Sequence, residues 1–471
     1  MRALQAAAVF FLTGISSGFT VTVLPGDAIQ DSLETLSEGD TLYLSPGTYT
    51  HTEEEPFLLL GPGQSGVCVV SHPLNRAVLD GEELERSVIA LAGPNDPPFI
   101  LANLIITGGN ATGGEFFSGG GIFSGEASAL VTNCEITGNA AIIGGGIGAE
   151  GGNLTLGYSD LTGNQAWVTG GGCDLYACTF TGYMLRFIGN ESSDDGGGFN
   201  SYQSTVDLSN SMFTSNYSGD DGGGICILQG NSVLEYLSVH ENEAFDDGGG
   251  LRIHTIDSLC ISSSIVTSNL GKAGINVISY NMPVVENVCC WNNEFANYNG
   301  MDDPTGYEGN ISEDPLFADG LLNLSQIQAG QPENSPAVDA GHENVQGSPV
   351  YGLSTRTDSL PDEGIADMGF HHINVDQTGV EGASPEEISV SVSPSPVTGQ
   401  STVSVRGVPA ASLEFCFYDI TGRILARSMV PVDHTGEAIH TLTPGKFPSG
   451  PLFFRARWET GEVLGRTVVL K

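Results

Sequence analysis

A glycine-rich motif that returns at nearly constant spacing constrains this chain more than any other feature. Six blocks of three glycines, each followed by an apolar residue, begin at positions 119, 144, 170, 196, 222 and 248. The first spacing is 25 residues and the next four are 26. A second marker, an apolar residue three positions before an asparagine, runs in step, with asparagines at 139, 164, 190, 216, 242 and 269. Two markers in phase over six repeats predict a repeat architecture.

The segments between the glycine blocks favour short strands. Runs such as 154–158, 205–209 and 232–236 alternate polar and apolar residues and are broken by Gly, Ser, Asn and Asp. Three short strands and three turns use roughly 26 residues at about 3.3 Å per strand residue. Coils of this kind stack about 4.8 Å apart and bury one continuous apolar column. The sequence therefore predicts a right-handed parallel β-helix, an all-β fold.

Both markers are best explained as structural. Glycine suits a corner that needs a positive φ or a close backbone approach. One asparagine per coil, stacked along the axis, would form an amide ladder. The apolar residue at the fourth position of each block would point inward, and Cys173 in that slot would be a small core residue.

These repeats resemble the Gly-Gly-Gly-Ile and Phe-x-x-Asn repeats of right-handed β-helix proteins, including the passenger parts of polymorphic outer-membrane proteins. The resemblance covers roughly residues 20–318. It implies the pectate-lyase-like β-helix fold. It says little about activity, because this fold hosts lyases, hydrolases, adhesins and inert stalks.

The start of the chain indicates export. Residues 1–18 combine Arg2, a short apolar stretch and small residues at 16–18, which is typical of a secretory signal peptide. The apolar stretch is too short to span a bilayer, and no later stretch approaches 18 apolar residues, so we expect no transmembrane segment. The β-helix would occupy residues 19–318, with an amphipathic helix of two turns over 29–36 that covers its open end.

Residues 319–375 resemble the closing segment found behind bacterial surface β-helices. The resemblance rests on Ser335-Pro-Ala-Val-Asp-Ala-Gly341 and Asp367-Met-Gly-Phe-His371. We interpret the segment as a C-terminal plug whose loops are pinned by buried aspartate–arginine contacts. A structural role is expected for Asp339, Asp358 and Asp367, with a catalytic role as the alternative.

The last part of the chain has a different character. Residues 376–387 are polar and read as a linker. Residues 388–471 hold seven short runs separated by turns, which predicts a small antiparallel Ig-like β-sandwich. The turn at 418–423, the turn at 448–450 and the terminus resemble the type IX secretion C-terminal sorting domain. That resemblance implies the secretion machinery as a partner, whereas a plain Ig-like spacer is the alternative.

Charge excludes one class of partner and favours another. The formal net charge is −41, and residues 1–387 hold seven basic and 50 acidic residues, a balance of 7 − 50 = −43. Such a β-helix repels nucleic acid and attracts divalent cations. Nine cysteines without metal-binding spacing leave disulfide pairing open.

One column of acids is the candidate metal site. Paired aspartates precede three consecutive glycine blocks in the same phase, so stacking would place them about 4.8 Å apart. Carboxylates this close repel one another unless a cation intervenes, and Ca²⁺ takes six to eight oxygen ligands. The pattern predicts Ca²⁺ as a cofactor here, with a solvated acidic turn as the alternative. The six residues are Asp194, Asp195, Asp220, Asp221, Asp246 and Asp247.

An outward-facing strip is the candidate ligand site. If the fourth residue of each block points inward, the fifth and seventh point outward. This places Tyr176, Tyr202, Arg252 and His254 on one strip near the aspartates, as expected for stacking on sugar rings. Packing between surface side chains of a sheet is the alternative. Arg252, His254 and Lys272 are the candidate catalytic residues, by resemblance to the calcium-plus-base arrangement of pectate lyases.

These observations point to a secreted or outer-surface β-helix protein, adhesin-like or glycan-binding, whose partner is an extracellular glycan or another surface ligand. The alternative function is a carbohydrate-active enzyme. A calcium-dependent polysaccharide lyase fits the basic residues better than a glycoside hydrolase, because six similar aspartates titrate as a group and lack the contrast that a hydrolase needs.

Overall fold

The structure, a computed structural model, describes residues 19–50, 58–73, 75–113, 118–254 and 257–373. In the last part of the chain it describes 389–393, 401–406, 412–418, 424–432, 438–442, 450–458 and 461–469. The expected signal peptide 1–18 and linker 376–387 lie outside these residues. The described chain divides into two compact units, one ending at Ile373 and the other beginning at Ser389.

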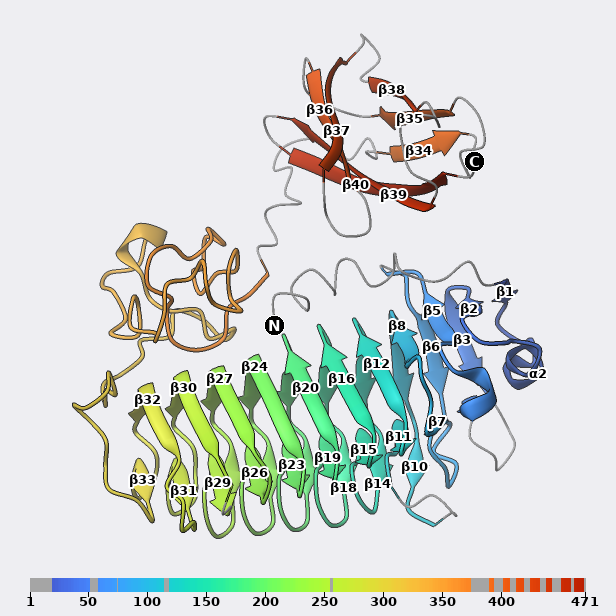
Figure 1. Cartoon of the computed structure of the whole chain (residues 1–471). Helices are drawn as coiled ribbons and strands as arrows, with labels where there is room; N and C mark the ends of the chain where they lie inside the picture. Colours follow the sequence, from blue (N-terminus) through green and yellow to red (C-terminus); the bar gives the residue numbers. More distant parts are fainter. Residues whose placement is uncertain are drawn as a thin grey trace. The chain divides into compact units, whose positions relative to one another are not determined.

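The first unit is a right-handed parallel β-helix, as the repeats predict (Figure 1). Each strand pairs in parallel with its counterpart in the next coil. For example, Cys173 of one coil lies opposite Phe199 of the next, and Phe199 lies opposite Ile225. The described coils form three sheets of seventeen, ten and six strands.

The widest sheet, with seventeen strands, bends along its length. From β24 onward two strands of each coil run on as one, and the residue at the bend, such as Asn210 or Tyr236, has a positive φ. The strands are β1 (Thr20–Val23), β2 (Thr41–Leu44), β3 (Gly47–Thr50), β5 (Cys68–Ser71), β6 (Ala77–Asp80), β8 (Phe99–Ala102), β9 (Leu104–Thr107), β12 (Ser128–Thr132), β13 (Glu135–Thr137), β16 (Asn153–Gly157), β17 (Asp160–Thr162), β20 (Thr179–Tyr183), β21 (Arg186–Ile188), β24 (Thr205–Thr214), β27 (Ser232–His240), β30 (Leu259–Thr267) and β32 (Val284–Trp291).

The other two sheets flank the turn that carries the paired aspartates. The glycine-block sheet, in which six strands directly follow the glycine blocks, contains β4 (Leu58–Leu60), β7 (Ile89–Ala92), β11 (Ile122–Gly125), β15 (Ile147–Glu150), β19 (Cys173–Tyr176), β23 (Phe199–Tyr202), β26 (Ile225–Leu228), β29 (Leu251–His254), β31 (Ile275–Val277) and β33 (Tyr298–Asn299). The narrow sheet contains β10 (Asn110–Ala111), β14 (Ala140–Ala141), β18 (Gln165–Ala166), β22 (Glu191–Ser192), β25 (Tyr217–Ser218) and β28 (Glu243–Ala244).

The asparagines form the predicted ladder. Each amide Nδ2 donates to the Oδ1 of the asparagine one coil further on, with Asn164 to Asn190 at 3.0 Å and Asn216 to Asn242 at 2.8 Å. Each Oδ1 also accepts from the backbone N–H of the preceding asparagine, and each Nδ2 also donates to a carbonyl of the preceding coil. The ladder runs from Asn139 through Asn269 to Asn293 and is buried, so its hydrogen bonds satisfy amides that would otherwise be costly inside the coil.

The glycine blocks are explained by their contact with this ladder. The first glycine has a positive φ, for example +65° at Gly196. The second has no room for a side chain, since a Cβ on Gly197 would lie 2.4 Å from the carbonyl oxygen of Tyr217. A Cβ on the third, Gly198, would lie 2.6 Å from the Gly224 oxygen and 3.2 Å from the amide carbon of Asn216. Because this glycine packs against the asparagine of its own coil, the two markers keep one phase.

The core is a column of apolar side chains inside the coils. The residue after each glycine block, including Cys173 and Phe199, is fully buried. Phe187 and Phe213 stack with ring centroids 4.5 Å apart and an interplanar angle of 5°. All eight cysteines of the described β-helix unit are free thiols. Burial of this column supplies the main driving force for the fold.

A short helix covers the first coil. Helix α2 (Ile29–Glu34) buries Ile29 and Leu33 in the same apolar core as the strands, and Leu36 follows them. The C-cap of the helix is Thr35, so the helix is shorter than the two turns expected over 29–36. Two 3₁₀ turns, η2 (Pro62–Gln64) and η3 (Ile327–Ala329), complete the helical elements of the described residues.

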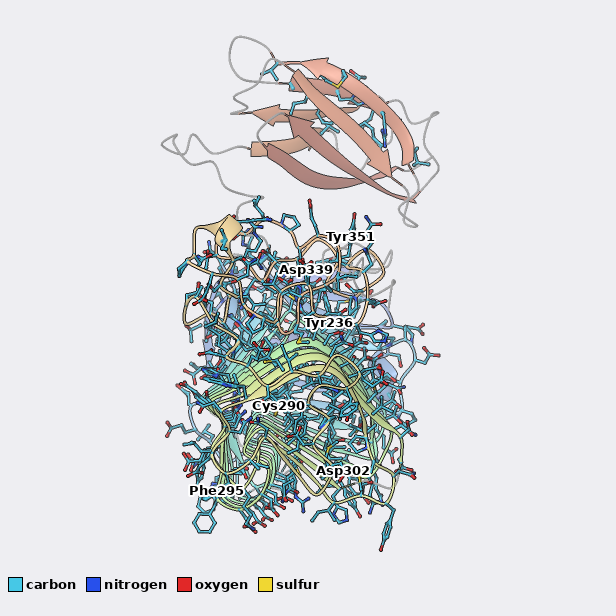
Figure 2. All side chains as sticks on the ribbon, turned by 90° about the vertical axis from the view of Figure 1, so that its left-hand side faces the viewer. Tyr236, Cys290, Phe295, Asp302, Asp339 and Tyr351 are labelled. Carbon is cyan, nitrogen blue, oxygen red and sulfur yellow. The ribbon has the colours of Figure 1, made fainter. Side chains whose placement is uncertain are left out.

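The closing segment is not a plug at the end of the β-helix. It lies over the outer face of the widest sheet, as the view nearly along the axis shows (Figure 2), and it donates hydrogen bonds to side chains of three successive coils. His371 exchanges two hydrogen bonds with the Asn210 side chain at the bend, and the backbone N–H of Phe370 donates to Ser238 Oγ. Its apolar side chains cover outward-facing ones of the coils, as Phe370 does with Tyr183.

The interior of the closing segment also differs from the expectation. The buried carboxylate is Asp367, and its partners are Gln326 Nε2, Thr355 Oγ1 and the backbone N–H of Asp339, not an arginine. The arginine of the segment, Arg356, instead pairs with Asp358, whose side chain is more exposed than that of Asp367. A sequence with no repeat in this region gives no signal for which acid becomes buried.

The second unit contains two antiparallel sheets. The three-stranded sheet holds β34 (Ser389–Ser393), β35 (Ser401–Arg406) and β38 (Ala438–Leu442). The four-stranded sheet holds β36 (Ser412–Tyr418), β37 (Ile424–Pro431), β39 (Gly450–Trp458) and β40 (Gly461–Val469). All seven expected runs overlap these strands, and Phe415 and Phe417 are buried. The Ig-like assignment and the sorting role stay predictions.

The glycine contacts lead to a first prediction. Gly197→Ala should destabilise the β-helix by about 3 kcal/mol or more, because the new Cβ overlaps a backbone carbonyl that cannot move without breaking the coil pairing. The control is Gly189→Ala, where φ is +62° but no atom lies within 4 Å, so the cost should stay near 1–2 kcal/mol. Denaturant midpoints measure both, and equal losses would contradict the steric explanation.

Candidate functional site

The paired aspartates lie on the turns between the narrow sheet and the glycine-block sheet, where they form one column that we call the aspartate edge. Backbone hydrogen bonds hold the register, with Asp220 N–H donating to the Asp194 carbonyl and Asp246 N–H to the Asp220 carbonyl. The column is bounded by other residue types. Thr169 precedes Gly170 one coil before it, and the Lys272 N–H donates to the Asp246 carbonyl one coil after it.

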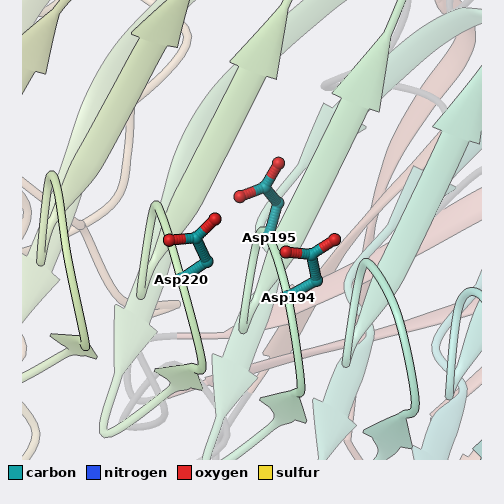
Figure 3. Close-up of side chains that lie close together, drawn as sticks. All are labelled: Asp194, Asp195 and Asp220. Atoms are coloured by element: carbon teal, nitrogen blue, oxygen red, sulfur yellow. The ribbon is translucent and has the colours of Figure 1, made fainter.

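Among the side chains that the structure describes, basic residues form ion pairs with only one end of the aspartate edge. Arg252 Nε lies 2.8 Å from Asp221 Oδ2. Lys272 Nζ contacts Asp246 Oδ1 and lies 3.4 Å from Asp247 Oδ1. The other end, Asp194 with Asp195 and Asp220, brings three carboxylate oxygens within 4.8 Å of one another (Figure 3). A divalent cation held by these oxygens would supply the charge that the two basic residues supply further along.

At the end of the aspartate edge that holds Asp194, Asp195 and Asp220, the pKa values of two carboxyl groups are raised. Partial burial, together with the neighbouring carboxylates of Asp194, Asp221 and Asp220, raises the pKa of Asp195 to about 6. The pKa of Asp220 is raised by burial and by the same kind of neighbours, although Arg252 lowers it in part. Oxygen ligands, excess negative charge and partial exposure fit Ca²⁺.

The fifth positions of the blocks are buried, which corrects the expectation that they face solvent. Asp174, Asn200, Cys226 and Arg252 are between 0 and 7% exposed. They point away from the core, but the turn before the glycines covers them, and Asn200 Nδ2 donates to Asp174 Oδ1 at 2.7 Å beneath it. These side chains support the aspartate edge from below and do not form an exposed surface.

The tyrosine strip is a separate feature. Tyr176 and Tyr202 stack with centroids 5.7 Å apart, and the register continues through Leu228 to His254, as expected. Tyr176 and Tyr202 are the last residues of their strands, however, whereas the paired aspartates lie in the turns before the strands of this sheet begin. A four-residue strand of about 13 Å therefore separates the strip from the aspartate edge. The structure does not bring Arg252 to the strip, because its guanidinium turns back to Asp221.

The candidate bases are poorly placed for proton abstraction. Arg252 is 7% exposed and is held by Asp221 and by Asn276 Oδ1, 3.0 Å away. Hydrogen bonding to Asp246 raises the pKa of Lys272, which keeps it charged. A base must be uncharged and within reach of its proton. His254 is exposed, but it belongs to the strip and not to the aspartate edge.

Two exposed aromatic residues flank the aspartate edge and were not singled out by the sequence analysis. Trp167 is 65% and Phe245 is 81% exposed. Both directly follow the narrow sheet in the same register, with Ser193 and Gly219 between them in the intervening coils. Three coil steps place their backbones about 14 Å apart. The only indication in the sequence is an aromatic residue at one position of the repeat. This position is aromatic in too few coils to form a recognisable pattern.

Comparisons with known proteins give little beyond the fold. No family model matches the sequence, and no curated protein matches it. Among solved structures, the chain is similar to one titled "Crystal structure of pectate lyase Pel9A", with 14% identity and a TM-score of 0.46. The alignment covers 76% of this chain and 98% of that chain. No helix among the described residues is long and apolar enough to cross a membrane.

The uncompensated end of the aspartate edge leads to a second prediction. Calcium at about 10 mM should stabilise the full chain by about 1.4–2.7 kcal/mol relative to chelator, if the Kd lies at about 10⁻⁴–10⁻³ M. Asp194→Asn combined with Asp220→Asn should remove this gain. Glu191→Gln combined with Glu243→Gln removes the same two charges from exposed acids outside the cluster, so this charge-matched control should keep the gain. Identical melting curves in calcium and chelator would rule out the site.

Proposed function

We propose that this chain is an exported surface protein that binds an extracellular glycan at the aspartate edge, with a divalent cation between the carboxylates and the sugar. The main support is the location of Asp194, Asp195 and Asp220, an uncompensated acidic cluster that lies between two exposed aromatic side chains. Three carboxylates leave part of a Ca²⁺ coordination shell open for ligand oxygens.

The aromatic residues fit the same ligand. Sugar rings present apolar C–H faces, and exposed aromatic rings offer flat surfaces on which such faces pack. Trp167 and Phe245, about three coil steps apart, would contact the two ends of a short stretch of glycan that runs along the axis. The small residues between them, Ser193 and Gly219, leave the aspartates accessible.

A glycan with carboxylates or neighbouring hydroxyl pairs suits this edge best. The formal net charge of −41 repels acidic polymers in the absence of metal, so binding of a uronic acid polymer would depend wholly on the cation. We favour binding over cleavage at this edge, since Arg252 and Lys272 are both engaged by carboxylates. A lyase would need a base from another part of the chain.

Export and surface delivery belong to the same proposal. The signal-like residues 1–18 and the C-terminal module with its two antiparallel sheets support it. A β-helix presents repeated columns along its length, which suits an adhesin-like role in contact with an extended polymer.

Binding to the aspartate edge gives a third prediction. On an immobilised uronic acid polymer with calcium, Trp167→Ala and Phe245→Ala should each weaken binding about 3–10-fold. Tyr280→Ala, which removes an aromatic ring that is 96% exposed in the loop before β32, should have no effect. Tyr202→Ala tests the strip in the same assay. Binding that persists in chelator and ignores Trp167→Ala would contradict the proposal.

Delivery to the surface gives a fourth prediction. A chain without residues 388–471 should fold its β-helix but stay inside the outer membrane, because the segment that the sorting machinery recognises is gone. Surface proteolysis and cell fractionation measure the outcome, and the full chain is the control. Normal surface delivery of the shortened chain would mean that these residues are only a spacer.

A further inference from the structure

The closing segment contains a cavity that is distinct from the aspartate edge. Its volume is about 600 Å³, within the range of small-molecule sites. It is built entirely from the closing segment, which itself docks on the outer face of the widest sheet. Its lining residues are Gln326, Gln328, Asn334, Val338, Asp339, Arg356, Leu360, Pro361, Asp362, Glu363 and Asp367.

Buried hydrogen bonds hold the floor of the cavity. Asp367 is 1% exposed and accepts from Gln326 Nε2 at 2.9 Å, from Thr355 Oγ1 and from the backbone N–H of Asp339 at 2.7 Å. Asp362 Oδ2 accepts from the backbone N–H of Asp367 and lies 3.2 Å from His371 Nε2. With their partners fixed inside the segment, these groups preform the wall that a ligand would meet.

The cavity carries an excess of negative charge. Its single arginine, Arg356, makes a bidentate pair with Asp358, which lies outside the lining, and this pairing neutralises the guanidinium. Four lining carboxyl groups remain, those of Asp339, Asp362, Glu363 and Asp367. Burial and the neighbouring Asp362 raise the pKa of Asp339, and the pKa of Asp367 is raised to about 6 by the same causes. The negative charge of these carboxylates therefore disfavours an anionic ligand.

The spacing of the carboxylates selects between a metal and an organic cation. Among the described residues, the groups of three acids close enough to share one ion both lie at the aspartate edge, and none lies in this cavity. The cavity is also much larger than one ion. Its amide side chains, Gln328 and Asn334, sit beside the acids and can hydrogen-bond to hydroxyl groups.

We propose that the cavity of the closing segment binds a small organic ligand that carries a protonated amine. Asp339 and Glu363, the lining acids that are exposed, would contact the ammonium group, and the amides would contact polar groups further along the ligand. The amine could belong to an amino sugar or to a polyamine. This site is independent of glycan binding at the aspartate edge.

Calorimetry on the full chain tests the proposal with three probes, glucosamine, N-acetylglucosamine and putrescine. Glucosamine or putrescine should bind, and N-acetylglucosamine, which keeps the sugar but lacks the charge, should bind at least 10-fold more weakly. Binding of glucosamine alone identifies an amino sugar, and binding of putrescine alone identifies a polyamine. No binding of either amine, or equal binding of glucosamine and its acetylated form, would overturn the proposal.

Matched variants locate the site. Asp339→Asn should weaken amine binding about 10-fold, and asparagine tolerates the positive φ of 54° at this position. Glu363→Gln should act in the same direction. Glu333→Gln, an exposed acid of the closing segment outside the lining, should have no effect. Amine binding that ignores Asp339→Asn would place the ligand elsewhere. Calcium-dependent glycan binding should be unchanged in all three variants, which separates the two sites.

Discussion

Registration of one coil on the next is the constraint on which the rest of the structure depends. The buried asparagine ladder sets it, because each amide both donates to and accepts from its neighbours along the axis. Gly198 and its equivalents pack against the same amides, so an inserted residue would break both contacts at once. Because the register is fixed, residues at the same position of successive repeats stack along the axis with a spacing of about 4.8 Å.

The aspartate edge is a consequence of this stacking, and its chemistry comes from the ends of the column. Lys272 and Arg252 form ion pairs in the later coils, whereas none of the described residues forms an ion pair with Asp194, Asp195 or Asp220. The fold thus concentrates charge at one place without any departure from its repeat. The cavity of the closing segment, by contrast, does not arise from the repeat, because it is built from irregular loops that share no phase with the coils.

The periodic features could be predicted from the sequence, and the contacts between distant segments could not. Glycine blocks, asparagines and paired aspartates recur in successive coils, so their positions in space follow from their phase. Arg252 is buried because a turn covers the outer side of its strand. The alternation of side chains along a strand predicts which side Arg252 lies on, but not that a turn covers it. The docking of His371 on Asn210 joins residues 161 apart without any repeat to announce it. For the same reason, the plug interpretation failed and the cavity was missed.

A crystal structure of the full chain grown in saturating calcium tests the central claim most directly, because it shows where a cation binds. The account predicts one Ca²⁺ on carboxylate oxygens of Asp194, Asp195 and Asp220, at about 2.3–2.6 Å, with open coordination positions toward Trp167 and Phe245. Density without an ion at these three carboxylates, in crystals that hold calcium elsewhere, would contradict it.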